Sequence, residues 1–193
     1  MTEWKLFSGE PPQWTTAEWY AGRERAPHLE QPEHRGRLLL AAEMAARITA
    51  RFPGGVVDLG CGDGGLLSLL PPHCPAWGYD LSPAAVSAAV HERHVDARLG
   101  DAVTGDTDWA PVAVATEMLE HLADPHAFVR KISRHCRAVV ASSPATETAE
   151  VHYEFHTWAW DMDGYAALLA QGGFGVTWHE RAGGFQVITG TRP

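Results

Sequence analysis

The sequence predicts an α/β fold in which a doubly wound, mostly parallel seven-stranded sheet carries helices on both faces. Short apolar runs alternate with segments of helical periodicity along most of the chain. The last two runs, at 174–179 and 185–189, are joined by a turn that contains glycine and predict a closing hairpin with one antiparallel strand near the sheet edge. The length of 193 residues suits a single domain, with residues 1–35 as an N-terminal helical lid and residues 36–193 as the core.

The expected elements follow in order along the chain. A short helix is expected at 15–22, capped by Thr15 or Thr16, and a longer one at 33–51 ends before a Pro-Gly-Gly turn. Five strands are expected, at 55–59, 76–80, 95–99, 112–116 and 137–142. Helices are expected between and after them, at 63–70, 82–91, 124–134 and 161–171. A polar, aromatic loop that holds Trp158 and Trp160 precedes the last helix.

Composition and charge narrow the functional classes. Apolar residues make up 45% and charged residues 20%, as in soluble globular proteins, and no apolar run has the roughly 18 residues that a membrane span needs. The N-terminus lacks the pattern of an export signal, and the three cysteines lack Cys-x-x-Cys spacing, so a cytoplasmic protein with free thiols is expected. A net charge of −9 argues against a broad nucleic-acid surface, since phosphate contacts need clustered Lys and Arg. A monomer or a homodimer is expected.

A glycine-rich turn follows the strand expected at 55–59. Gly60, Gly62 and Gly65 satisfy the G-x-G-x-x-G pattern, whose glycines let the backbone turn sharply and approach a nucleotide-type cofactor. Acids close this strand and the two that follow, at Asp58, Asp80 and Asp101. Because a carboxylate in the turn would repel a pyrophosphate, the turn suits S-adenosylmethionine, with its ammonium and sulfonium, better than a dinucleotide.

At this point the chain resembles the class I S-adenosylmethionine-dependent methyltransferases, whose fold is Rossmann-like. The matching pieces are Val-Val-Asp-Leu-Gly-Cys-Gly-Asp-Gly (56–64), Gly-Tyr-Asp-Leu-Ser (78–82), Gly-Asp-Ala (100–102) and Glu-Met-Leu-Glu-His-Leu (117–122). The resemblance implies that the glycine turn touches the methionine part of the donor, that Asp80 holds the ribose hydroxyls and that Asp101 meets the adenine amine. The implied donor site comprises Asp58, Gly60, Cys61, Gly62, Asp80, Leu81, Asp101, Ala102, Thr116 and Glu117. The alternative is that Asp80 and Asp101 only cap a helix or a turn.

The second candidate site is the block at 117–121. If this segment is helical, Glu117, Glu120 and His121 lie on one face. The block is similar to that of ubiquinone-pathway O-methyltransferases and small-RNA 2′-O-methyltransferases, in which the two glutamates and the histidine are linked to a divalent metal. The resemblance implies a metal site at Glu117, Glu120 and His121, with His156 or His152 as a fourth ligand. The alternative is a metal-free site in which His121 lies in the acceptor pocket, as a general base or as a cap of the loop.

These patterns predict an enzyme that transfers a methyl group from S-adenosylmethionine to an oxygen or nitrogen of a small-molecule acceptor. Glu117, Glu120 and His121 are the expected catalytic residues, and Tyr20, His152 and His156 are the expected residues of the acceptor pocket. One alternative is a metal-dependent small-RNA 2′-O-methyltransferase, although no basic groove is visible in the sequence. Another is a donor-binding protein of the same fold without catalysis. A nucleotide-binding dehydrogenase is disfavoured by Asp58.

Overall fold

The computed structural model describes residues 2–192 and contains a seven-stranded sheet in the order β4-β3-β2-β5-β6-β9-β8. Strands β2 to β6 pair with one another in parallel, whereas β9 runs antiparallel to both β6 and β8. The predicted fold class, with one antiparallel strand near the edge, is therefore confirmed. The strand bounds are β2 (Val56–Leu59), β3 (Ala76–Asp80), β4 (Asp96–Leu99), β5 (Val112–Thr116), β6 (Ala138–Pro144), β8 (Gly175–Ala182) and β9 (Phe185–Thr191).

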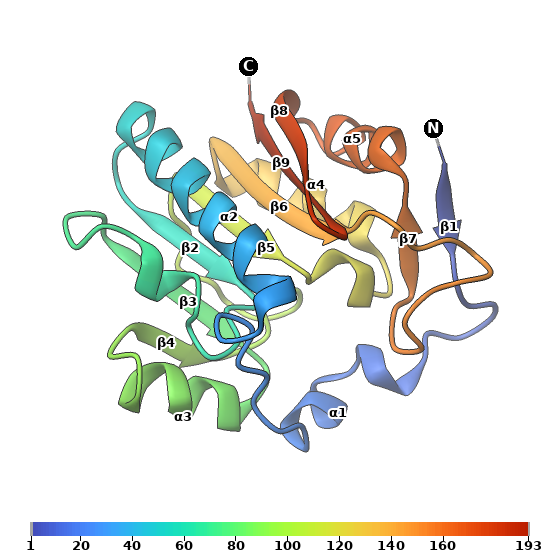
Figure 1. Ribbon diagram of the computed structural model, residues 1–193, viewed down its shortest axis with the longest axis horizontal. Coiled ribbons are helices and arrows are strands. Elements are labelled where there is room, and N and C mark those ends of the chain that lie inside the picture. Colours follow the sequence, from blue (N-terminus) through green and yellow to red (C-terminus); the bar gives the residue numbers. More distant parts are fainter. Residues whose placement is uncertain (1, 193) are drawn as a thin grey trace.

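Helices cover both faces of this sheet. Helices α2 (Pro32–Arg51) and α3 (Pro83–His91) lie over one face, and α4 (Pro125–His135) and α5 (Met162–Gln171) lie over the other (Figure 1). Successive strand residues alternate between the two hydrophobic cores, so that Val56 packs with α2 while Val57 packs on the side of α4 and α5. Because both faces are covered, the central strands β2 and β5 are buried at every position.

Helices α3, α4 and α5 each begin with a capping side chain. Ser82 accepts a hydrogen bond from the Ala85 amide at the start of α3, and Asp124 and Asp161 cap α4 and α5 in the same way. A proline follows Ser82 and Asp124 at the first helical position, where it needs no hydrogen-bond donor. In the part of the chain that the structure describes, no helix is both long and apolar enough to span a lipid bilayer.

The prediction of a helix at 63–70 is wrong. Only a single 3₁₀ turn, η2 (Leu67–Leu69), forms in this segment. The glycine turn extends to Gly64, which has φ = +76°, a left-handed conformation outside any right-handed helix. Pro71 follows soon after and ends the segment, so too few residues remain for regular helical turns.

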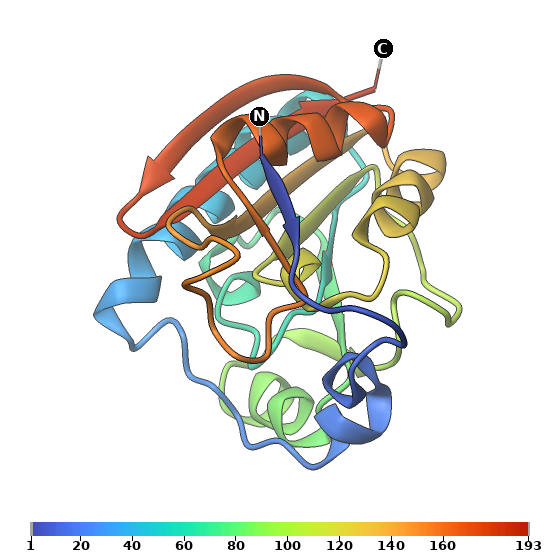
Figure 2. The same cartoon turned by 90° about the vertical axis from the view of Figure 1, so that its right-hand side faces the viewer.

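A second, two-stranded sheet joins the N-terminal segment to the loop after β6. Strand β1 (Glu3–Lys5) pairs antiparallel with β7 (Trp158–Trp160), and the indole of Trp160 donates a hydrogen bond to Glu3 (2.7 Å). This corrects the expectation of an irregular loop at Trp158 and Trp160. Figure 2 shows β1 beside β7, from where the chain continues through η1 (Gln13–Thr15) and α1 (Ala17–Ala21), the predicted short helix, towards α2.

Candidate active site

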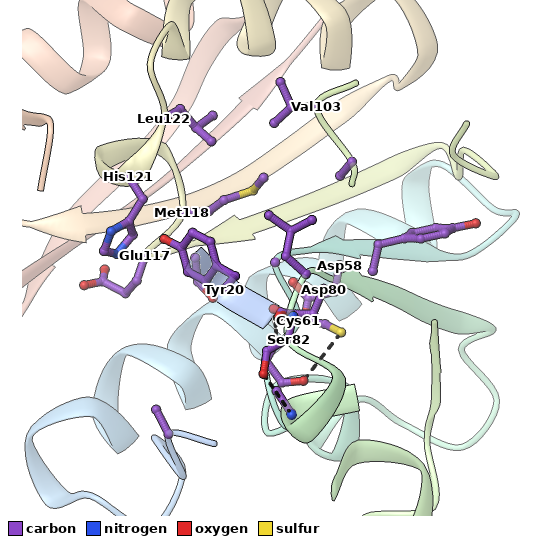
Figure 3. Close-up of a pocket in the computed structure, with 18 of the residues that line it drawn as sticks. Tyr20, Asp58, Cys61, Asp80, Ser82, Val103, Glu117, Met118, His121 and Leu122 are labelled. Atoms are coloured by element: carbon purple, nitrogen blue, oxygen red, sulfur yellow. Dashed lines mark hydrogen bonds between the residues drawn. The ribbon is translucent and has the colours of Figure 1, made fainter. Parts of the chain in front are cut away.

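A cavity of about 1290 Å³ opens at the carboxyl ends of the parallel strands, beneath the N-terminal segment. This is the edge at which parallel α/β sheets bind ligands. The expected site residues that line it are Tyr20, Asp58, Gly60, Cys61, Gly62, Asp80, Leu81, Asp101, Ala102, Thr116, Glu117, His121 and His156. Figure 3 shows Tyr20, Glu117 and His121 on one side of this cavity and Asp58, Cys61 and Asp80 on the other.

Two expected residues lie elsewhere. Glu120 is buried behind the cavity wall, and His152 is exposed on the loop after β6, where its ring bonds to the Thr148 carbonyl. The placement of His152 in the acceptor pocket is therefore corrected. His156, four residues further on, is the histidine of this loop that reaches the cavity.

The glycine turn presents backbone to the cavity. Gly60 and Gly62 have φ of +76° and +55°, which favour glycine, and a Cβ added at Gly62 would meet no atom within 4 Å. The turn is held from behind by the Tyr79 carbonyl, which accepts hydrogen bonds from the Gly60 and Cys61 amides. A ligand can therefore approach the backbone of Gly62 closely.

Asp80 and Asp101 hold the adjoining turns. Asp80 accepts hydrogen bonds from the amides of Gly62 and Ser82, both at 2.8 Å, and burial nevertheless raises its pKa. Asp101 accepts from the amides of Val103 and Thr104 and closes its own turn. Both acids are thus turn caps, and both also line the cavity. A carboxylate oxygen has more than one lone pair, so the capping bonds leave acceptor capacity for a ligand.

Asp58 is a buried acid without a full set of partners. Its side chain is 1% exposed, and Oδ1 has no hydrogen-bond partner among residues 2–192. Burial, together with the charge of Asp80, raises the pKa of Asp58 to about 7, and the Arg37 guanidinium opposes this rise. An ammonium group beside Asp58 would restore the charged form.

Arg37 is the site residue that the sequence reasoning missed. It lies on α2, is 1% exposed and lines the cavity, and its Nη1 has no hydrogen-bond partner within the described part of the chain. Its other nitrogens lie 3.3–3.5 Å from Nδ1 of His28 and His34, and Nε lies 3.9 Å from Glu117. The signal in the sequence was its spacing, since Arg37 precedes Ala41 and Ala45 on one buried stripe of α2.

Burial and the charge of Arg37 both favour the neutral form of its two histidine neighbours. Burial first, and then the charge of Arg37, lowers the pKa of His28 to about 4, and the same two causes lower the pKa of His34. The cationic charge at this end of the cavity therefore belongs to the guanidinium.

The block at 117–121 does not form one helical face. Glu117 has φ = +51°, and only Leu119–His121 forms a 3₁₀ turn, η3. The Glu117 carboxylate accepts a hydrogen bond from the Ser142 hydroxyl at 2.9 Å. Burial raises the pKa of Glu117 against the opposing effect of Arg37.

The fold does bring Glu120, His121 and His156 together. Their ligand atoms lie within 4.8 Å of one another, and they are the only such group of three among the described residues. Glu117 is not a member, so the expected four-residue set is corrected to three. Burial and the charge of His156 lower the pKa of His121 to about 3, which makes His121 a weak general base and suits it better to orienting a ligand.

The N-terminal segment is fastened on both sides of the cavity. At one end β1 pairs with β7, and at the other Arg93 bonds both Glu30 (2.8 Å) and Asp63 (2.7 Å), while Arg25 bonds Glu92. Between these anchors Trp19 packs against Phe155 at 5.1 Å between ring centroids, and Tyr20 lies edge-on to His121. We call residues 7–31 the strap, because they cross the cavity between two fixed points.

The chain is similar to known methyltransferases in sequence. A methyltransferase domain family model matches residues 33–183. The trans-aconitate 2-methyltransferase of Mycolicibacterium gilvum (strain PYR-GCK) is 42% identical over 92 residues, which are 45% of this chain and 32% of that protein. The match therefore spans about a third of that relative's length.

Solved structures share the fold at low sequence identity. Magnesium protoporphyrin IX methyltransferase from Synechocystis PCC 6803, with bound SAH, has a TM-score of 0.67 and 14% identity over 91% of this chain and 92% of that one. The [4+2]-cyclase SpnF has a TM-score of 0.71 and 17% identity over 96% and 99%. At these identities the likeness concerns the fold alone.

Proposed function

The chain belongs to the class I S-adenosylmethionine-dependent methyltransferases, and on that premise we propose that it transfers a methyl group from this donor to an oxygen or nitrogen of a small-molecule acceptor. One observation carries the proposal. Asp58 and Arg37 are both buried beside the glycine turn, and each retains a charged atom without a partner among the described residues. A buried carboxylate and a buried guanidinium in one cavity complement the ammonium and carboxylate of an amino acid.

The fit of the donor follows from this pair. The amino-acid end would lie between Asp58 and Arg37, with the open backbone of Gly62 beside it. The ribose hydroxyls would bond Asp80, whose carboxylate already aligns the turn, and the adenine would meet Asp101 and Ala102. This order runs along the carboxyl edge of the sheet from β2 to β4. Cys61, Leu81 and Thr116 complete the wall.

The chain's own contribution to the reaction is to orient the acceptor and exclude water. When bound, the donor supplies an activated methyl group, so alignment of the acceptor atom is the main requirement. His121 donates its Nδ1 hydrogen to the Phe155 carbonyl (3.1 Å), which leaves Nε2 as a hydrogen-bond acceptor for the ligand. The strap, with Trp19 and Tyr20, covers the cavity from solvent.

The acceptor is proposed to be a small organic molecule, and trans-aconitate is the first compound to assay. The relatives that are named for this substrate support that choice, although the match spans only a third of their length. The aromatic side chains of the strap and the loop after β6 line the acceptor half. We also propose a single-domain, cytoplasmic enzyme, for which the three free cysteines are an argument.

The net charge of −9 argues against the alternative of an RNA substrate. The alternative of donor binding without methyl transfer is supported by the fold shared with the [4+2]-cyclase SpnF. Since a fold does not determine the chemistry, methyl transfer must be measured as well as binding.

Calorimetry with two ligands tests the donor site. S-adenosylhomocysteine carries the amino-acid end, whereas 5′-methylthioadenosine lacks it. Arg37→Met should weaken binding of the first by roughly 10–100-fold, the cost of one or two charge-assisted hydrogen bonds, and leave the second unchanged. Arg47→Met, on the same helix but 69% exposed, is the matched control.

Methyl transfer itself is measured with labelled donor and a panel of carboxylate, hydroxyl and amine acceptors that includes trans-aconitate. Binding without turnover on any acceptor would favour the non-catalytic alternative. No binding of either ligand to the wild-type protein would refute the donor site.

A further inference from the structure

Three potential metal ligands meet where two separate segments come together. Glu120 and His121 belong to the turn after β5, and His156 comes from the loop after β6, 35 residues further along the chain. Their ligand atoms lie within 4.8 Å of one another. Two ligands at about 2.0–2.2 Å from one ion are at most about 4.4 Å apart, so side-chain shifts of a few tenths of an ångström would bring these atoms to coordination distance.

Both histidines are held with the same nitrogen available. The Nδ1 of His156 lies 2.6 Å from the Glu147 carboxylate, and the Nδ1 of His121 lies 3.1 Å from the Phe155 carbonyl. Since both partners are acceptors, each Nδ1 carries the hydrogen and each Nε2 keeps its lone pair. Histidines that bind metals are commonly oriented by such a carboxylate or carbonyl on the other nitrogen.

Glu120 is a buried carboxyl group without hydrogen-bond partners in the described part of the protein. Its side chain is 0% exposed, and neither carboxyl oxygen has a hydrogen-bond partner in the described chain. Leaving such a group unsatisfied is costly, and buried acids without partners are rare in folded proteins. A bound cation would satisfy it.

We infer that Glu120, His121 and His156 bind a divalent transition metal, and that Glu147 is the positioning residue that orients His156 for it. Two imidazoles and one carboxylate are a donor set for zinc, iron, manganese or cobalt rather than for magnesium or calcium, which prefer oxygen ligands. His121 and His156 line the cavity, so positions of the metal not taken by the protein face the acceptor half.

Glu117 is left out of this site, in contrast to the ligand set implied by the resemblance of the 117–121 block. Its carboxylate is bonded to Ser142 and lies 3.9 Å from Arg37, so a positive charge already balances it. Glu117 and Glu120 therefore differ in role although they occupy equivalent positions in the motif. This makes them a matched pair for an experiment.

The place of this metal site beside the acceptor rests on the proposed function. The test therefore measures metal binding alone, without donor or acceptor. A negative result for the metal is then distinct from a negative result for methyl transfer. Protein treated with a chelator and then dialysed is titrated with Zn²⁺, Mn²⁺, Co²⁺ and Mg²⁺ by calorimetry. We expect one equivalent of Zn²⁺ or Co²⁺ to bind, with Mg²⁺ at least roughly 100-fold weaker. The Co²⁺ form should show a visible absorption spectrum that reports imidazole ligands.

Variants assign the ligands. Glu120→Gln and His156→Asn should each abolish stoichiometric binding and the Co²⁺ spectrum, whereas Glu117→Gln should retain both. Glu147→Gln should weaken binding by roughly 10–100-fold without changing the stoichiometry. Circular dichroism and thermal unfolding check that each variant is folded.

Two results would overturn the inference. One is no stoichiometric binding of any transition metal to the wild-type protein. The other is binding that persists in Glu120→Gln and His156→Asn, since the metal would then be held by other histidines of the chain. Loss of binding in Glu117→Gln alone would equally reject the three-ligand set.

Discussion

Asp58 ends a strand that is buried on both faces, and its charge is therefore determined by its neighbours. The low dielectric surroundings and the nearby Asp80 favour the protonated form, and Arg37 favours the ionised one. The result is a carboxyl group that changes its charge near neutral pH. A donor that brings an ammonium group would shift this balance towards the carboxylate.

Asp58 should make the ligand-free protein less stable as the pH rises. Its native pKa of about 7 lies above the unfolded value near 3.8, so between these values only the unfolded state releases the proton. The free energy of unfolding should fall by about 4 kcal/mol across this range, and the loss should persist above pH 7. Below pH 3.8 both states are protonated and the contribution vanishes.

The measurement is urea denaturation of the wild type and Asp58→Asn from pH 5 to pH 8.5. The variant should gain stability relative to the wild type as the pH rises, whereas the exposed Asp106→Asn should show no such trend. Parallel curves for the wild type and Asp58→Asn would show that Asp58 does not titrate in this range.

At the level of elements, the strap is the feature that closes the cavity. One anchor is a β-ladder of three residue pairs, and the other consists of ion pairs, of which Arg93 with Glu30 and Asp63 is the most buried. Asp63 belongs to the glycine turn, so this anchor connects the strap directly to the backbone that faces the donor. The ionic anchor is the one that a single substitution can release.

Replacing Arg93 by Gln should loosen the strap. Loss of its hydrogen bonds to Glu30 and Asp63 should cost about 1–2 kcal/mol and raise the dissociation rate of S-adenosylhomocysteine by roughly 5–30-fold. Hydrogen exchange should increase in residues 17–31 and remain unchanged in β1. The exposed pair of Arg47 and Glu43 supplies the control, since Arg47→Gln should alter neither quantity. Equal exchange in Arg93→Gln and the wild type would show that the ionic anchor does not hold the strap.

For the whole molecule, the sheet and the strap enclose the donor cavity between elements far apart in the sequence. The carboxyl edge of the sheet supplies the glycine turn and the acids, α2 supplies Arg37, and the strap and the loop after β6 supply the aromatic cover. A ligand that contacts all of these parts should stabilise the fold as a unit.

Saturating S-adenosylhomocysteine should therefore raise the melting temperature. At 100 times the dissociation constant the gain is about 2.7 kcal/mol, which corresponds to roughly 5–10 °C for a domain of this size. Asp80→Ala should lose most of this shift at the same ligand concentration, because Asp80 aligns the Gly62 amide and is proposed to bond the ribose hydroxyls. Thermal unfolding followed by circular dichroism gives both values. An equal shift in Asp80→Ala would remove Asp80 from the donor site.

The sequence by itself determined the features that depend on local order along the chain. Short apolar runs and helical periodicity predicted all seven strands of the main sheet and the helices capped by Ser82, Asp124 and Asp161, because burial of apolar segments and capping are local requirements. The acids at the strand ends predicted where the cavity lies, since parallel strands bring their carboxyl ends to one edge. The same reasoning failed at 63–70, where left-handed glycines prevailed over helical periodicity.

Only the tertiary structure decided which polar side chains meet. Arg37 on a helix lies 3.9 Å from Glu117 and acts electrostatically on Asp58, β1 pairs with β7 across more than 150 residues, and His156 rather than His152 joins Glu120 and His121. Glu117 and Glu120 look equivalent in the motif, yet Glu117 has a left-handed backbone and bonds Ser142, whereas neither carboxyl oxygen of Glu120 has a partner in the described chain. Such encounters depend on backbone conformation and on packing between distant segments, and neither is encoded in the spacing of residues along the chain.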